Sequence, residues 1–105
     1  MNKAIIILSL LFTTLSANGE DWITVNDMSQ VKWQITPAGR VYFRNLNEFN
    51  NQALPCCYNY YLDTTTPGGK SLWSVILTKM ATSKKLILGT PKISTAGAIT
   101  YAGIW

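Results

Sequence analysis

Apolar and polar residues alternate in two neighbouring stretches of the chain, 31–35 and 40–44. A period of two is typical of β-strands that bury one face. Pro37, Ala38 and Gly39 lie between the stretches and suit a turn. We therefore predict a β-hairpin whose register brings the apolar residues of both strands to the same face. This register pairs Ile35 with Val41, Gln34 with Tyr42 and Trp33 with Phe43, and it places Lys32 opposite Arg44.

A helix is predicted from Pro67 onward, because apolar residues recur there at spacings of three and four. Thr66 is a suitable N-cap, and proline suits the first helical turn. One arc of this helix is apolar, and the opposite arc carries small residues. The apolar arc contains Leu72, Trp73, Ile76, Leu77 and Met80, and the small-residue arc contains Ser71, Ser74, Thr78, Ala81 and Thr82. Lys84 and Lys85 place cations near the negative end of the helix, and a short apolar strand follows at 86–88.

Two further strands are predicted, at 58–63 and 97–105. The last stretch is apolar on both faces, and an exposed apolar edge promotes aggregation. This strand is therefore either covered on both sides within the subunit or paired with a second subunit. Together with the small-residue arc of the helix, it predicts a homo-oligomer. Residues 20–28 show no clear period and form either a loose segment or an edge segment.

The first 19 residues have the pattern of a secretory signal peptide. A positive start precedes an apolar run at 4–12 and a small, polar stretch at 13–19. The alternative is a membrane anchor, but the apolar run is shorter than the roughly 20 residues that a spanning helix needs. We expect cleavage of 1–19, a secreted or periplasmic protein, and no membrane insertion after cleavage. The expected remainder is a loose segment at 20–28 and a single domain at 29–105.

The composition argues against catalysis. The chain contains no histidine, which excludes Ser–His and Cys–His catalysis and removes the usual metal ligand. Its five Asp and Glu residues are scattered, so a catalytic carboxylate pair is not expected. We therefore expect no enzyme activity, no metal and no cofactor. Without Lys3, eight Lys and Arg residues stand against five acidic ones, and this net charge of +3 favours anionic partners.

The only two cysteines, Cys56 and Cys57, are adjacent. An exported protein meets oxidising conditions, which favour disulfides. Three states remain open: a disulfide between the two neighbours, a bridge between two chains, or two buried thiols. A metal site is not expected, because two adjacent thiolates provide too few ligands.

The predicted order of elements is strand, strand, strand, helix, strand, strand. For a small α+β domain, mainly β with one helix, this order predicts an OB-like five-stranded barrel. The apolar arc of the helix would then close one end of the barrel.

Two parts of the chain resemble known families. The stretch 70–90, KSLWSVILTKMATSKKLILGT, and the final AITYAGIW resemble the B subunits of bacterial A–B toxins, which are OB-folds that bind receptors as pentamers. Residues 60–63 (YYLD) and 69–73 (GKSLW) resemble a pattern in small secreted bacterial proteins of unknown role. In that group, one cysteine often precedes the first motif and another follows the strand after the helix. Here 90–92 (TPK) occupies the second place, so the resemblance leaves Cys56 as the partner for Cys57 within the chain.

Lys32, Arg40, Tyr42 and Arg44 share the polar face of the predicted hairpin. An aromatic ring beside cations suits sugar stacking and carboxylate capture. We therefore expect a secreted, non-enzymatic binding module for a glycan or an acidic surface, with these four residues as the ligand-binding set. The alternative is an envelope structural or protein-interaction module that binds through a strand edge. Nucleic acid is not an expected partner, because export and the modest charge argue against it.

Overall fold

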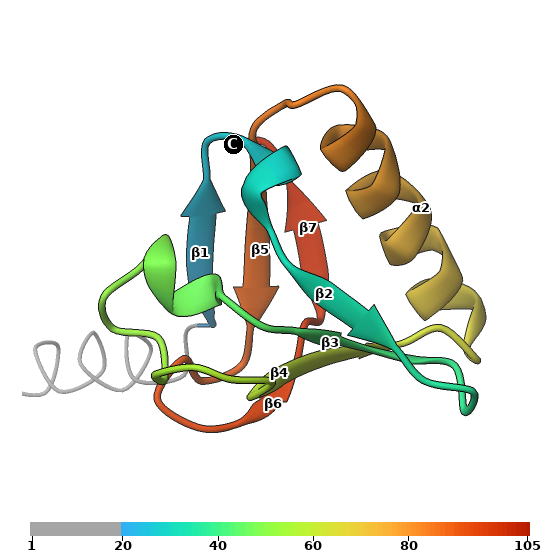
Figure 1. Ribbon diagram of the computed structural model, residues 1–105, viewed down its shortest axis with the longest axis horizontal. Helices are drawn as coiled ribbons and strands as arrows, with labels where there is room; N and C mark the ends of the chain where they lie inside the picture. The colour runs from blue at the N-terminus through green and yellow to red at the C-terminus, as the bar shows by residue number, and fades with distance from the viewer. Residues whose placement is uncertain (1–19) are drawn as a thin grey trace, which may run out of the picture.

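The computed structural model describes residues 20–105, and the expected signal peptide at 1–19 lies outside the described residues. The described residues form an α+β fold with one α-helix and two sheets (Figure 1). The three-stranded sheet has the order β1-β5-β7, and the four-stranded sheet has the order β2-β3-β4-β6. The elements are β1 (Asp21–Val25), β2 (Trp33–Ile35), β3 (Arg40–Phe43), β4 (Tyr60–Asp63), α2 (Pro67–Ala81), β5 (Leu86–Thr90), β6 (Gly97–Ala98) and β7 (Tyr101–Gly103).

The hairpin of β2 and β3 has the predicted register. Ile35 pairs with Val41, Gln34 with Tyr42 and Trp33 with Phe43. Gly39 turns the chain with a φ of 84°, a conformation that glycine adopts without steric cost. The apolar residues of β3 are buried, whereas Trp33 and Ile35 are exposed because β2 is the outer strand of its sheet.

Helix α2 begins as predicted. The Thr66 hydroxyl accepts a hydrogen bond from the amide of Gly69 at 2.9 Å, and Pro67 is the first helical residue. Ile76 of the apolar arc is fully buried, as predicted, and the small-residue arc is exposed on the surface of the single chain. The prediction for Leu77 is wrong, because its side chain is 39% exposed. This residue lies about 100° around the helix from Ile76 and therefore falls at the margin of the buried arc.

The predicted five-stranded barrel is wrong, since residues 20–105 form seven strands in two sheets and no closed barrel. One cause is the segment 20–28, which is not loose. Its strand β1 pairs antiparallel with β5 along its whole length, from Asp21 opposite Thr90 to Val25 opposite Leu86. Ile23 and Val25 of this strand are fully buried, so β1 contributes to the core.

The second cause is that the predicted final strand divides between the two sheets. β6 pairs parallel with β4, and β7 pairs antiparallel with β5. The amide of Ile99 donates to the Tyr61 carbonyl at 2.8 Å, and the next amide, of Thr100, donates to the Gly89 carbonyl at 2.8 Å. Consecutive residues therefore join different sheets, and two sheets replace one continuous barrel.

The core lies between the inner faces of the two sheets and helix α2. Figure 1 shows α2 alongside β7, with the four-stranded sheet crossing below the three-stranded one. Within residues 20–105, no helix has the length and apolar character needed to cross a membrane. The outer faces of both sheets are turned away from the core, and the candidate sites lie there.

Candidate functional site

The pairing of β3 with β4 gathers polar and aromatic side chains on the outer face of the four-stranded sheet. Arg40 lies opposite Asp63, and Tyr42 lies opposite Tyr61. Residues directly opposite one another project to the same face of a sheet. The intervening side chains, Val41, Phe43, Tyr60 and Leu62, belong to the core. We call the outer surface the basic aromatic face; it comprises Lys32, Arg40, Tyr42, Arg44, Tyr58 and Tyr61.

Arg40 stacks on an aromatic ring. Its Cζ lies 4.1 Å from the centroid of the Tyr61 ring, which is a close cation–π contact. The Tyr42 ring lies 6.1 Å from the Tyr61 ring at an interplanar angle of 52°. A hydrogen bond with the Tyr42 side chain raises the pKa of Arg40. Three side chains from two strands therefore support one another in a fixed group.

A polar hollow of about 250 Å³ lies beside this group at the turn of the hairpin. Its lining consists of Thr36, Ala38, Arg40, Tyr42, Asp63 and Thr65. Asp63 Oδ1 accepts hydrogen bonds from the Thr65 hydroxyl at 2.6 Å and from the Thr65 amide at 2.9 Å. These two hydrogen bonds, with a smaller effect from the charge of Arg40, hold the pKa of Asp63 below its ordinary value. The ionised carboxylate compensates part of the Arg40 charge.

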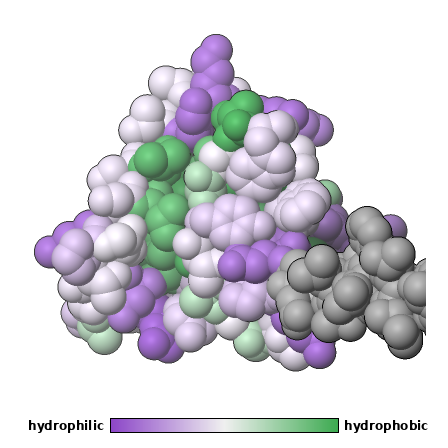
Figure 2. All heavy atoms as spheres, turned by 180° about the vertical axis from the view of Figure 1, so that it is seen from behind, coloured by the Kyte–Doolittle hydropathy of each residue, from purple (hydrophilic) through white to green (hydrophobic). Residues whose placement is uncertain are grey.

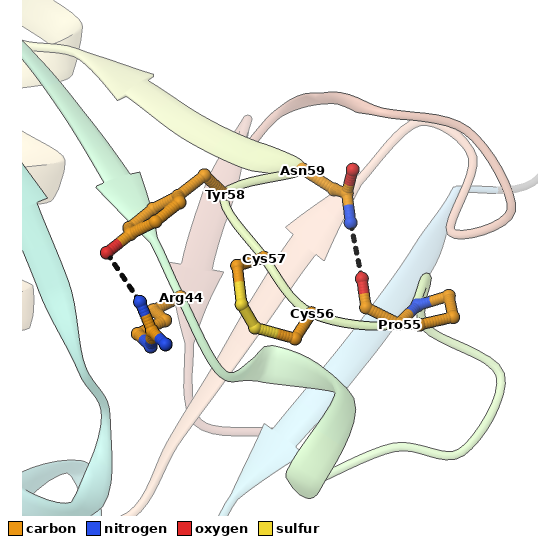
Figure 3. The surroundings of a disulfide bond; sticks show 6 residues. All are labelled: Arg44, Pro55, Cys56, Cys57, Tyr58 and Asn59. Carbon is orange, nitrogen blue, oxygen red and sulfur yellow. Dashed lines mark hydrogen bonds between the residues drawn. A yellow bond between two sulfur atoms is a disulfide. The ribbon is translucent and has the colours of Figure 1, made fainter.

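Arg44 has a second aromatic partner, which comes from the loop before β4 (Figure 3). Its Nη1 donates a hydrogen bond to the Tyr58 hydroxyl at 2.9 Å, and its Cζ lies 5.5 Å from the Tyr58 ring centroid. Tyr58 follows directly after Cys56 and Cys57, which are joined by a disulfide. The Asn59 side chain donates to the Pro55 carbonyl at 2.6 Å and closes the loop. Figure 3 shows the Tyr58 side chain reaching toward Arg44 from this loop.

Lys32 is held opposite Arg44 by a buried asparagine. The Arg44 amide donates to the Lys32 carbonyl at 2.8 Å, which extends the hairpin register by one residue pair. The side-chain oxygen of Asn45 accepts from the Lys32 amide at 2.8 Å, and its amide group donates to the Gln30 carbonyl at 3.0 Å. Both Lys32 and Arg44 are exposed. Two cations therefore face solvent at the end of β3 that lies away from the hairpin turn.

The structure divides the four expected ligand-binding residues into two groups on one face. Arg40 and Tyr42 lie near the hairpin turn, whereas Arg44 and Lys32 lie at the other end of β3. Sequence reasoning missed the two tyrosines that stack with the arginines, Tyr58 and Tyr61, and the bracing role of Asn45. For Tyr61 the sequence does contain a signal, because the alternation in 58–63 places it on the strand face opposite to that of Tyr60 and Leu62. The partner strand was not visible in that pattern.

Carboxylate and cysteine side chains within residues 20–105 form no group of three or more that could hold a metal ion. No protein-family model, curated protein or solved structure matches the chain.

Proposed function

We propose that this protein is an exported, non-enzymatic binding module whose basic aromatic face holds a glycan bearing carboxylate groups. The observation that carries the proposal is the stack of Arg40 on Tyr61 at 4.1 Å, with Tyr42 beside it. A guanidinium stacked on a ring keeps its N–H edge available, and that edge matches a carboxylate with two parallel hydrogen bonds. The tyrosine rings offer apolar surface for the C–H face of a sugar.

The spacing of the two arginines favours an extended ligand over a single small acid. Arg40 and Arg44 are four residues apart on one strand face, which corresponds to about 13 Å at about 3.3 Å per residue. Asp63 compensates part of the charge at Arg40, whereas Lys32 adds to the charge at Arg44. We therefore place one carboxylate of the ligand at Arg40, a second at the more strongly cationic Arg44, and a sugar ring between the arginines, over Tyr42.

The test compares an oligosaccharide of uronic acid units with its carboxyl-reduced, neutral counterpart, by calorimetry and amide NMR titration of the exported protein. We expect binding of the acidic form, with the largest shifts in β3 and β4. Arg44→Gln should weaken binding by about tenfold or more, because a charged hydrogen bond contributes about 1.5–3 kcal/mol. Lys85→Gln removes the same charge near the far end of α2 and should leave the affinity unchanged.

Two outcomes would overturn this proposal. Equal affinity for the neutral counterpart, measured from the amide shifts of β3 and β4, would mean that this face does not recognise carboxylates. Equal affinity for a polyglutamate peptide would mean that the face binds acidic surfaces in general and does not select sugars.

A second candidate role, self-association through a strand edge, is supported by an apolar groove of about 530 Å³ beside β7. The groove runs between β7 and the first half of α2, and Leu72, Ile99 and Ala102 are among its lining residues. β7 is the outer strand of its sheet. Figure 2 shows hydrophobic residues gathered in a band on this side of the molecule. A second copy of the chain is a suitable occupant, because pairing removes an exposed edge.

The outer arc of α2 also fits close packing against a second copy. The hydroxyls of Ser71, Ser74, Thr78 and Thr82 donate to the carbonyl four residues earlier, at 2.8–3.1 Å. These side chains therefore present little unsatisfied polarity. Light scattering at micromolar concentration should give a multiple of the subunit mass. Thr78→Arg should yield a folded monomer, whereas the control Thr95→Arg, in an exposed loop, should remain oligomeric. A monomeric mass for the unsubstituted protein would refute self-association.

A further inference from the structure

Three segments that are far apart in the sequence meet around a second hollow, beside strand β1. It has a volume of about 280 Å³ and is separate from the basic aromatic face. Its lining consists of Glu20, Asp21, Trp22, Asn50, Gln52 and Ile93. We call it the Trp22 hollow.

Hydrogen bonds fix the walls of the Trp22 hollow. Asp21 Oδ2 accepts from the amide of Ile93 at 2.8 Å, which ties the loop after β5 to β1. The Asn50 side chain donates to the Trp22 carbonyl at 3.4 Å and accepts from the Gln52 amide at 2.8 Å. Two loops are therefore fastened to the same strand, so the hollow is formed before any ligand arrives.

Trp22 presents an indole ring to solvent, with 52% of its surface exposed. The ring meets Trp105 at a centroid distance of 6.1 Å and an angle of 86°, an edge-to-face arrangement that braces it. Its cross-strand partner is Gly89. A side chain at that position would clash with the Tyr101 ring, which lies directly over the glycine. Packed neighbours therefore hold the exposed ring in place.

Polar groups that line the Trp22 hollow remain available to a ligand. Glu20 Oε2 accepts from the Thr100 hydroxyl at 3.1 Å, and Asp21 uses Oδ2 for the amide of Ile93. Among residues 20–105, the second oxygen of each carboxylate and the side-chain amide of Gln52 have no hydrogen-bond partner. These groups supply acceptors from the carboxylates and two donors from the amide.

We propose that the Trp22 hollow binds an uncharged sugar ring. The indole provides a flat apolar surface for the C–H face of a pyranose, while carboxylate and amide groups suit its hydroxyls. Two carboxylates repel an acidic sugar, so this site selects against the ligand class proposed for the basic aromatic face. The two sites share no residue, and each can be tested without the other.

The test uses saturation-transfer NMR on the exported protein, with maltose, cellobiose and lactose as probes at about 10 mM, suited to dissociation constants near 1 mM. At least one probe should receive saturation from the protein. Trp22→Ala should abolish the transfer, and Gln52→Ala should reduce it several-fold. Trp33→Ala is the matched control, because it removes another exposed tryptophan, from β2 in the other sheet, and should leave the transfer intact.

Three results would overturn the proposal: no transfer to any probe, transfer that persists in Trp22→Ala, or equal loss in Trp33→Ala. Should Trp22→Ala fail to fold, Gln52→Ala decides, because Gln52 is exposed and its removal leaves the core unchanged. Unchanged transfer in that variant then counts against the site. Arg44→Gln should not affect the transfer, so failure here is distinguishable from failure of carboxylate binding on the other face.

Discussion

Replacing Ile76 with alanine tests the packing of the whole fold, because this residue joins the helix to the two sheets. Its side chain is fully buried and belongs to the cluster of core residues from both sheets. The next residue, Leu77, is 39% exposed. The two residues carry side chains of the same size on adjacent positions of α2, so Leu77→Ala is a matched control for Ile76→Ala.

The expected cost follows from the atoms removed. Ile76→Ala deletes three carbon atoms, each contributing about 0.8 kcal/mol when buried, which gives about 2.4 kcal/mol. A residual cavity of roughly 50 Å³ adds about 1.2 kcal/mol, at about 24 cal/mol per Å³. The free energy of unfolding should thus fall by about 3.6 kcal/mol. For Leu77→Ala, the buried fraction limits the loss to about 1.5 kcal/mol, and no closed cavity forms.

Urea unfolding, followed by tryptophan fluorescence, measures the free energy of unfolding of both variants. The two values are compared using the same slope of free energy against urea concentration. A chain of this size has a total stability of only about 4–13 kcal/mol, so Ile76→Ala could unfold it. Ile76→Val, with an expected loss of about 1 kcal/mol, is the milder substitution to measure in that case. A loss for Leu77→Ala that equals or exceeds that for Ile76→Ala would refute this orientation of the helix. It would also return Leu77 to the buried arc that the sequence pattern favours.

Three further predictions concern other parts of the molecule. Folding lowers the pKa of Asp63, so its ionised carboxylate stabilises the folded state at pH values above the unfolded pKa of about 3.9. This stabilisation is lost as the pH falls through the folded pKa. Asp63→Asn should therefore be less stable than the unsubstituted protein at neutral pH, and the gap in urea midpoints should narrow near pH 3; a constant gap contradicts the assignment. Mass spectrometry of exported protein should find a first residue of Asn18 or Glu20, and an intact leader in a membrane fraction would count against the signal peptide. On non-reducing gels, a covalent dimer should not be the main species. Cys56→Ser leaves Cys57 unpaired and should increase the fraction of covalent dimer. A dominant dimer of the unsubstituted protein would contradict the pairing of the two neighbours.

The parts of the fold that sequence reasoning predicted correctly are those fixed by near neighbours. The hairpin register depends on matching the apolar residues of 31–35 and 41–43 across a short turn, and the structure has this register. The start of α2 depends on Thr66 and Pro67 alone, and the cap is present. In both cases the deciding contacts span only a few residues, so the local pattern contains the information.

The barrel prediction was wrong because strand count and sheet membership depend on distant partners. Residues 20–28 have little periodicity, and β1 exists because β5 supplies an uninterrupted buried strand for it to pair with. The stretch 97–105 is apolar on both faces, which is compatible with a covered strand but does not reveal a change of sheet. That change occurs between Ile99 and Thr100, whose amides donate to the carbonyls of Tyr61 in β4 and Gly89 in β5, about forty and about ten residues earlier in the chain.

The two candidate sites differ in how much of each was visible in the sequence, and the difference has the same physical origin. Lys32, Arg40, Tyr42 and Arg44 lie in, or directly beside, two strands joined by one turn, so alternation alone assigns them to a common face. The rings that stack with the arginines come from β4 and the preceding loop, beyond the range of that pattern. The Trp22 hollow has no local pattern at all. Its walls are closed by hydrogen bonds that join β1 to residues 28 and 72 positions away. A periodicity identifies which side chains share a strand face, whereas a concave site needs the loops that tertiary pairing brings to the end of that strand.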